Sequence, residues 1–117
     1  MMAMPSFEMP AGIDPLQITL LAEQIGPEGV QEVVAETLAA MPAELQLLAR
    51  QIDDGLVAVY PKTAHRIKGQ ALTFGLRALV AHCDHLERFP NDDPAGRLAQ
   101  VLTAWDQAKT WLQDAAA

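Results

Sequence analysis

The sequence is poor in aromatic residues, in cysteine and in basic side chains. Aromatic residues make up 5% of its 117 residues, and alanine and leucine dominate where strands would carry Val, Ile, Thr and Tyr. The lone Cys83 has no partner for an intramolecular disulfide. No apolar run approaches the roughly 20 residues that a membrane-spanning helix needs. With 8 Lys and Arg against 15 Asp and Glu, the net charge of -7 argues against nucleic acid or anionic membrane as a partner. We therefore expect an all-α, cytoplasmic protein that binds another protein or a small ligand.

The length suits one compact domain. The first dozen residues are rich in Met and Pro, but they lack the basic start and the apolar stretch of a secretory signal. We expect residues 1–13 to form a flexible N-terminal arm and residues 14–117 to form a single domain. The initial methionine and the Ala-rich end favour a free-standing protein over a piece of a larger kinase, and we expect it to be a monomer.

Proline, glycine and apolar spacing indicate five helices. Asp14-Pro15 resembles an N-cap followed by proline, and Gly26 ends a short first helix. Apolar residues at three-and-four spacing then predict a long helix over residues 27–52. Pro42 lies inside that pattern, so a kink or a break is expected near Ala39 or Ala40, and the continuing periodicity favours a kink.

Three further helices follow in the second half of the chain. One begins near Tyr60, which leaves Pro61 in its first turn, and ends at Gly75. The next covers residues 76–89, and the last begins at Asp93-Pro94. Short connections make the four long helices an antiparallel up-down four-helix bundle, with the additional short N-terminal helix packed across one end.

In the last helix one face is expected to be buried, and Trp111 points away from it. We expect Trp111 to cover the N-terminal arm. The expected face consists of Leu98, Val101, Leu102, Trp105, Ala108 and Leu112.

One exposed patch on the third helix contains residues that could take part in a reaction. His65 lies roughly 140° from the centre of the apolar stripe at about 100° per residue, and Lys68 and Gly69 share its side of the helix. A neutral imidazole is a nitrogen nucleophile at neutral pH. Lys68 would balance charge on phosphoryl oxygens. Gly69 would clear the approach of a partner, although a glycine inside a helix costs roughly 0.5–1 kcal/mol relative to alanine.

The segment around this patch resembles the histidine-containing phosphotransfer (HPt) domain family. That family's pattern reads Ala-His-x-Leu-Lys-Gly-Ser-Ala, with a later Leu-Gly or similar pair and a later Leu-Glu. The likeness extends loosely over residues 14–114. It is carried here by Ala64-His65-Arg66-Ile67-Lys68-Gly69-Gln70-Ala71, by Phe74-Gly75, by Leu79 and Cys83, and by Leu86-Glu87.

The resemblance implies that His65 is phosphorylated, that Lys68 supports the phosphoryl group and that Gly69 gives access. The chain would relay phosphate between a histidine kinase, hybrid or separate, or a receiver-domain aspartate and a response-regulator aspartate. Mg²⁺ would sit on the partner receiver, and no cofactor would be bound here. There is no Gly-rich phosphate loop, so we expect a phosphocarrier without ATP-dependent kinase activity. Arg66, where sensor kinases usually carry an acid, also argues against self-phosphorylation.

The surface that faces the partner is expected to include Arg66, Gln70 and Leu72. Gln70 stands where the family usually has Ser or Ala, so this surface departs from the pattern. An alternative function is a non-phosphorylated helical adaptor that binds a receiver domain or a kinase. The intact His65 argues against this alternative.

Two other clusters could imitate a metal site. His82, Cys83 and His85 have zinc-binding side chains, but on a helix Cys83 faces the core while His85 points outward, so they do not converge. Turns and helix caps explain the acidic residues Asp53-Asp54 and Asn91-Asp92-Asp93. We therefore expect no metal site.

Overall fold

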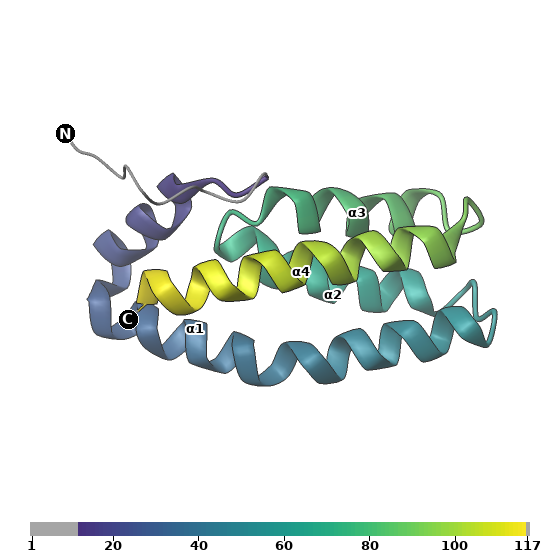
Figure 1. The fold of residues 1–117 in the computed structure, drawn as a ribbon, viewed down its shortest axis with the longest axis horizontal. Coiled ribbons are helices and arrows are strands. Elements are labelled where there is room, and N and C mark those ends of the chain that lie inside the picture. The colour runs from purple at the N-terminus through teal and green to yellow at the C-terminus, as the bar shows by residue number, and fades with distance from the viewer. Residues whose placement is uncertain (1–11, 117) are drawn as a thin grey trace.

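The computed structural model describes residues 12–116, and these form an all-helical domain of four helices (Figure 1). Most of the expected arm, residues 1–13, lies outside the described residues. No strand occurs within residues 12–116, although Ile13 and Leu76 form one isolated antiparallel bridge. The helices are α1 (Pro15–Asp53), α2 (Tyr60–Thr73), α3 (Arg77–Arg88) and α4 (Pro94–Ala116).

Helix α1 begins at the expected cap and bends at Gly26. The Asp14 side chain accepts a hydrogen bond from the backbone N–H of Leu16 at 3.1 Å, and Pro15 occupies the first turn. Gly26 has φ 80° and ψ 165°, a conformation that is essentially restricted to glycine. The residues of the expected short first helix are continuous with α1, but the kink at Gly26 sets them apart as an N-terminal limb that folds over one end of the molecule (Figure 1).

Main-chain hydrogen bonds attach the start of this limb to the start of α3. The N–H of Asp14 donates to the carbonyl of Gly75 at 2.8 Å, and that of Ala78 donates to the carbonyl of Gly12 at 3.0 Å. Gly75 has φ 69°, and a Cβ there would lie 2.6 Å from the Asp14 carbonyl oxygen. Only glycine suits this position, which ends α2 and receives the N-terminal segment.

Pro42 does not break α1. The helix keeps helical φ and ψ through this residue, and Gly26 is where the backbone of α1 departs from them. Pro42 is exposed, while Met41 and Leu45 beside it are buried. Packing of these side chains on both sides of the proline offsets the hydrogen bond that it removes. The break considered near Ala39 or Ala40 is therefore wrong, and the kink that the periodicity favours there stays a prediction.

The remaining helices begin where the sequence predicts. Helix α2 starts at Tyr60 with Pro61 in its first turn, where proline costs no helical hydrogen bond. The hydroxyl of Tyr60 donates to the carbonyl of Pro90, which joins the start of α2 to the loop between α3 and α4. Before α4, the Asp93 carboxylate accepts from the N–H of Gly96 at 3.2 Å, as expected of an N-cap.

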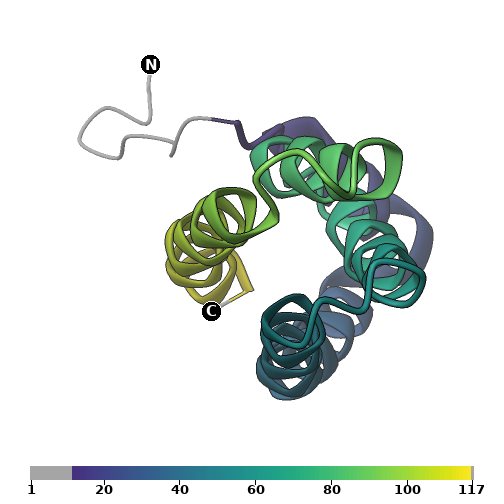
Figure 2. The ribbon, with the colours of Figure 1, turned by 90° about the vertical axis from the view of Figure 1, so that its right-hand side faces the viewer.

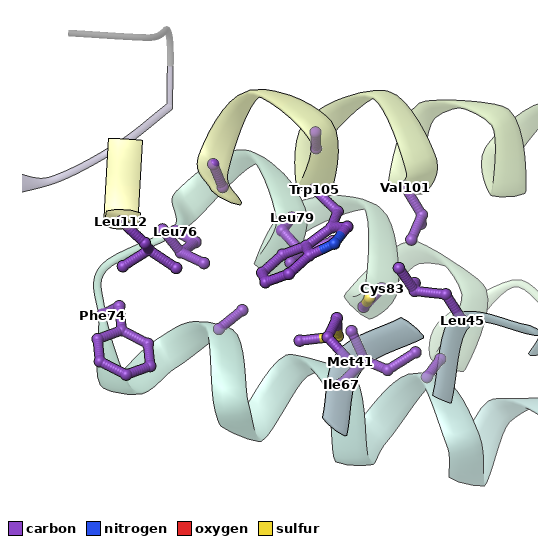
Figure 3. Close-up of a cluster of buried hydrophobic side chains, with 14 of the residues drawn as sticks. Met41, Leu45, Ile67, Phe74, Leu76, Leu79, Cys83, Val101, Trp105 and Leu112 are labelled. Carbon is purple, nitrogen blue, oxygen red and sulfur yellow. The ribbon is translucent and has the colours of Figure 1, made fainter. Parts of the chain in front are cut away.

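The four helices close into a ring with one core. Contacts join α1 to α2, α2 to α3, α3 to α4 and α4 to α1, and Figure 2 shows this order around the bundle. No helix within residues 12–116 is long and apolar enough to cross a membrane. Figure 3 shows the core, whose fully buried side chains include Met41, Leu48, Tyr60, Ile67, Phe74, Leu76, Leu79, Leu86 and Leu112.

The face that α4 buries includes Val101, Trp105, Ala108 and Leu112, as expected, but it extends further than the expected stripe. Trp111 is 5% exposed and belongs to the core, so the prediction that it points away is wrong. Leu102, expected in the core, is 42% exposed. The physical reason is that α4 packs against both α1 and α3, which buries a broader arc than one stripe and turns that arc toward Trp111.

Candidate functional site

Helix α2 holds His65 on its outer side. The apolar stripe of Ala64, Ile67 and Ala71 is buried completely, which turns the residues between them outward. The His65 side chain is 68% exposed. One turn later, a Cβ built on Gly69 would meet nothing within 4 Å, so this chain's own packing does not require a glycine there.

Glu87 of α3 orients the imidazole. Its Oε2 lies 2.8 Å from His65 Nδ1. A carboxylate accepts hydrogen bonds and does not donate them, so this contact favours the neutral tautomer with its proton on Nδ1. The other ring nitrogen, Nε2, then keeps its lone pair for attack on an electrophile.

Lys68 shares the same carboxylate. Its Nζ lies 2.5 Å from Glu87 Oε1 and 3.3 Å from Asp84 Oδ1. The hydrogen bond to Glu87 is the main reason that the pKa of Lys68 is raised, and the hydrogen bond from Lys68 lowers the pKa of Asp84. Side chains on a helix lean toward its N-terminus, which brings Lys68 back toward His65. Lys68 therefore stays protonated at neutral pH and places a positive charge near the imidazole.

Arg66 and Gln70 lie on the side of α2 that faces α1. The Arg66 guanidinium makes two hydrogen bonds to the Glu44 carboxylate, from Nε at 2.9 Å and from an Nη at 3.1 Å. These hydrogen bonds raise the pKa of Arg66. Gln70 is half-buried, and its buried Oε1 accepts no hydrogen bond from the described residues.

Leu72 lies on the other side, next to the His65 patch. It is 55% exposed, and it lines a hollow at the α2–α3 corner together with Arg77, Val80 and Asp84. Of the six residues expected from the sequence, His65, Lys68, Gly69 and Leu72 thus share one surface, while Arg66 and Gln70 flank it.

Three carboxylates that contact these residues were not among the expected site residues: Glu44, Asp84 and Glu87. A signal for Glu87 was present, because the Leu86-Glu87 pair forms part of the family resemblance. Asp84 lies one turn before Glu87 on the same face of α3, which places it opposite Lys68. Glu44 has no such signal, since its contact depends on how α1 packs beside α2.

The cluster of His82, Cys83 and His85 does not converge. Cys83 is buried in the core, where burial raises the pKa of its thiol to about 12. Burial, with Arg97 nearby, lowers the pKa of His82, whose Nδ1 lies 3.0 Å from that guanidinium. His85 Nε2 instead lies 3.0 Å from Asp92 Oδ2. Within residues 12–116, no three His, Cys, Asp or Glu side chains gather as metal ligands would.

One comparison with known proteins identifies a family. The family model described as Hpt domain matches residues 32–116, which is more than half of the chain and includes the whole His65 site. No curated protein and no solved structure matches the chain.

Proposed function

Because the chain belongs to the Hpt domain family, which acts in two-component phosphorelays, we propose that it relays a phosphoryl group through His65. The donor is a histidine kinase, hybrid or separate, or a receiver-domain aspartate, and the acceptor is a response-regulator aspartate. The observation that carries this proposal is the exposed imidazole, whose Nδ1 contacts the Glu87 carboxylate and leaves Nε2 available for attack.

The transfer needs no base on this chain. Nε2 of His65 attacks the phosphorus of the receiver's aspartyl phosphate, the P–O bond to the aspartate breaks, and the aspartate leaves as a carboxylate. Nδ1 keeps its proton, so the phosphorylated ring is positively charged until that proton is lost. The Glu87 carboxylate at 2.8 Å stabilises this charge. Onward transfer to the second aspartate is the same step in reverse.

Lys68 and Gly69 act at the phosphoryl group in different ways. The Lys68 ammonium shares the Glu87 carboxylate with the imidazole, and it can bind the phosphoryl oxygens once His65 is phosphorylated. Gly69 leaves open space one turn from His65, so the loops of a receiver can approach closely. The receiver provides the aspartate and the Mg²⁺, and this chain binds no cofactor of its own.

The surface around His65 suits an acidic, partly apolar partner. Exposed Leu72 offers an apolar contact. Arg66 and Gln70 flank the surface and contribute at its edge. The chain carries a net charge of -7, yet α2 and α3 hold five of its eight Lys and Arg residues: Lys62, Arg66, Lys68, Arg77 and Arg88. Four of these five pair with carboxylates of this chain, and the acidic phosphorylation pocket of a receiver would compete for them on a monomeric carrier in the cytoplasm.

A transfer assay tests the proposal. The protein is mixed with a phosphorylated receiver and Mg²⁺, and the label that it acquires should be acid-labile and alkali-stable. We expect transfer to the wild type and to His85→Gln, a matched variant of a histidine on α3, and none to His65→Gln. The relay would be refuted if His65→Gln were labelled as strongly as the wild type. It would also be refuted if no receiver that binds the wild type transferred phosphate to it.

The adaptor alternative predicts a different pattern. An adaptor would bind a receiver with similar affinity in the wild type and in His65→Gln while neither accepts phosphate. Titration calorimetry beside the transfer assay separates the two functions.

A further inference from the structure

The Lys68 ammonium lies between two carboxylates of α3. Glu87 Oε1 and Asp84 Oδ1 lie 2.5 Å and 3.3 Å from its Nζ. Glu87 also holds the imidazole through its other oxygen. Asp84 forms ion pairs with Lys68 and Arg88, and none with His65 among the described residues. The two carboxylates therefore act differently, because Asp84 touches the nucleophile only through Lys68.

A phosphoryl group on Nε2 of His65 would add negative charge to the surroundings of Lys68. It adds negative charge beside an ammonium that is already shared by two carboxylates. The phosphoryl oxygens can form an ion pair with Lys68 only if the contact of Lys68 with Glu87 or with Asp84 weakens. The 3.3 Å contact with Asp84 is the longer one, and Asp84 has a second cation at hand, since Arg88 Nε lies 3.0 Å from its Oδ2.

We propose that Asp84 is a positioning residue that holds Lys68 back from the phosphoryl group on His65 and so keeps the phosphorylated form easily discharged. This inference rests on the proposed function of His65. It adds a residue that tunes how long the phosphoryl group stays, by competing with that group for one cation.

The direction of the effect follows from the transition state. Phosphoryl transfer passes through a loose, metaphosphate-like state in which the P–N bond is largely broken. The phosphoryl oxygens then carry less negative charge than they do in phosphohistidine. An ammonium on these oxygens stabilises the ground state more than the transition state, which slows discharge. Withholding Lys68 therefore speeds discharge.

The test uses phosphorylated protein made without any partner. Phosphoramidate labels His65 chemically: Nε2 bonds to phosphorus, the P–N bond of the reagent breaks, and ammonia leaves. After removal of the reagent, water replaces the imidazole on phosphorus, and the release of inorganic phosphate at neutral pH gives the rate of discharge. Because no receiver takes part, this rate is measurable even if relay from a receiver were to fail.

We expect Asp84→Asn to slow discharge about two- to fivefold, the size expected for one partly screened charge at this range. Arg88→Gln should act in the opposite direction, because Asp84 then has Lys68 as its sole cation. Asp106→Asn is the matched control. It removes the same charge from α4, which is not a neighbour of α2 in the ring of helices, and its discharge rate should equal that of the wild type.

A double-mutant cycle asks whether the effect passes through Lys68. In a Lys68→Gln background, the Asp84→Asn substitution should no longer change the rate. Equal rates for the wild type and Asp84→Asn would overturn the inference. A slowing that persists in the Lys68→Gln background would overturn it too, since the charge would then act directly on the phosphoryl group. Circular dichroism spectra that match the wild type would show that each variant is folded.

Discussion

At the scale of single residues, Glu87 is the side chain that decides which imidazole nitrogen is free. We expect Glu87→Gln to lower the initial rate of transfer from a phosphorylated receiver about three- to tenfold. The substitution removes the charge that favours a proton on Nδ1 and that stabilises the phosphorylated ring. The contact is exposed on the His65 side, so the loss should be far smaller than for a buried triad. Rapid-quench kinetics measures it.

The tautomer gives this prediction a second readout. Long-range proton–nitrogen NMR correlations of the wild type should show His65 with its proton on Nδ1, and a mixture of tautomers in Glu87→Gln. Glu36→Gln, which removes a charge from an exposed position on α1, serves as the control. An unchanged tautomer together with an unchanged rate would show that Glu87 does not orient the imidazole.

Periodicity was informative for one helix at a time. It placed His65 on the outside of α2 with Lys68 and Gly69 beside it, and the structure has His65 exposed there. It could not supply the carboxylates, because Asp84 and Glu87 come from α3 and Glu44 from α1. Such contacts depend on the position of one helix along another, and the residue spacing within a single helix does not predict that position.

At the scale of the helix, substitutions of Gly69 should affect stability and phosphoryl transfer differently. A Cβ at this position meets nothing, so Gly69→Ala should raise the free energy of unfolding by about 0.5–1 kcal/mol through helix propensity alone. Gly69→Leu should also stay helical, but its bulk lies beside the nucleophile and should block transfer. Urea denaturation followed by circular dichroism measures stability, and the receiver assay measures transfer.

Gly26 provides the contrast within the same molecule. Its φ of 80° suits glycine, so Gly26→Ala should destabilise the protein by about 1–3 kcal/mol, although space is open there as well. If Gly69→Ala were destabilising, or if Gly69→Leu accepted phosphate at the normal rate, then the steric explanation of Gly69 would be wrong.

The ends of the helices were easier to predict than their interiors. Asp14-Pro15, Pro61 and Gly75 act through local backbone chemistry, and each lies where that chemistry requires. The disruption expected from Pro42 did not break α1, because Met41 and Leu45 pack into the core on either side of it. Tertiary packing overrides a local preference when the gain from burial exceeds the cost of one hydrogen bond.

At the scale of the whole molecule, the ring of helices determines which side chains become core. An apolar stripe predicts one buried face, but α4 has two neighbours, α1 and α3. Its buried arc therefore extends to Trp111 and leaves Leu102 partly in solvent. The stripe alone predicted Leu102 in the core and Trp111 outside it, and both predictions are wrong. Predicting them correctly required the positions of two other helices.

The burial of Trp111 on α4 leads to a prediction about the stability of the whole domain. We expect Trp111→Ala to lower the free energy of unfolding by about 3–5 kcal/mol, because it leaves a cavity where a side chain only 5% exposed now packs. A loss of this size is a large share of the roughly 5–15 kcal/mol that stabilises a small domain. Leu102→Ala, on the same helix, should cost less than about 1 kcal/mol, because that side chain is 42% exposed. Urea titrations of both variants measure the difference. Equal losses, or a larger loss for Leu102→Ala, would mean that α4 presents the face expected from its stripe rather than the one that Trp111 shares.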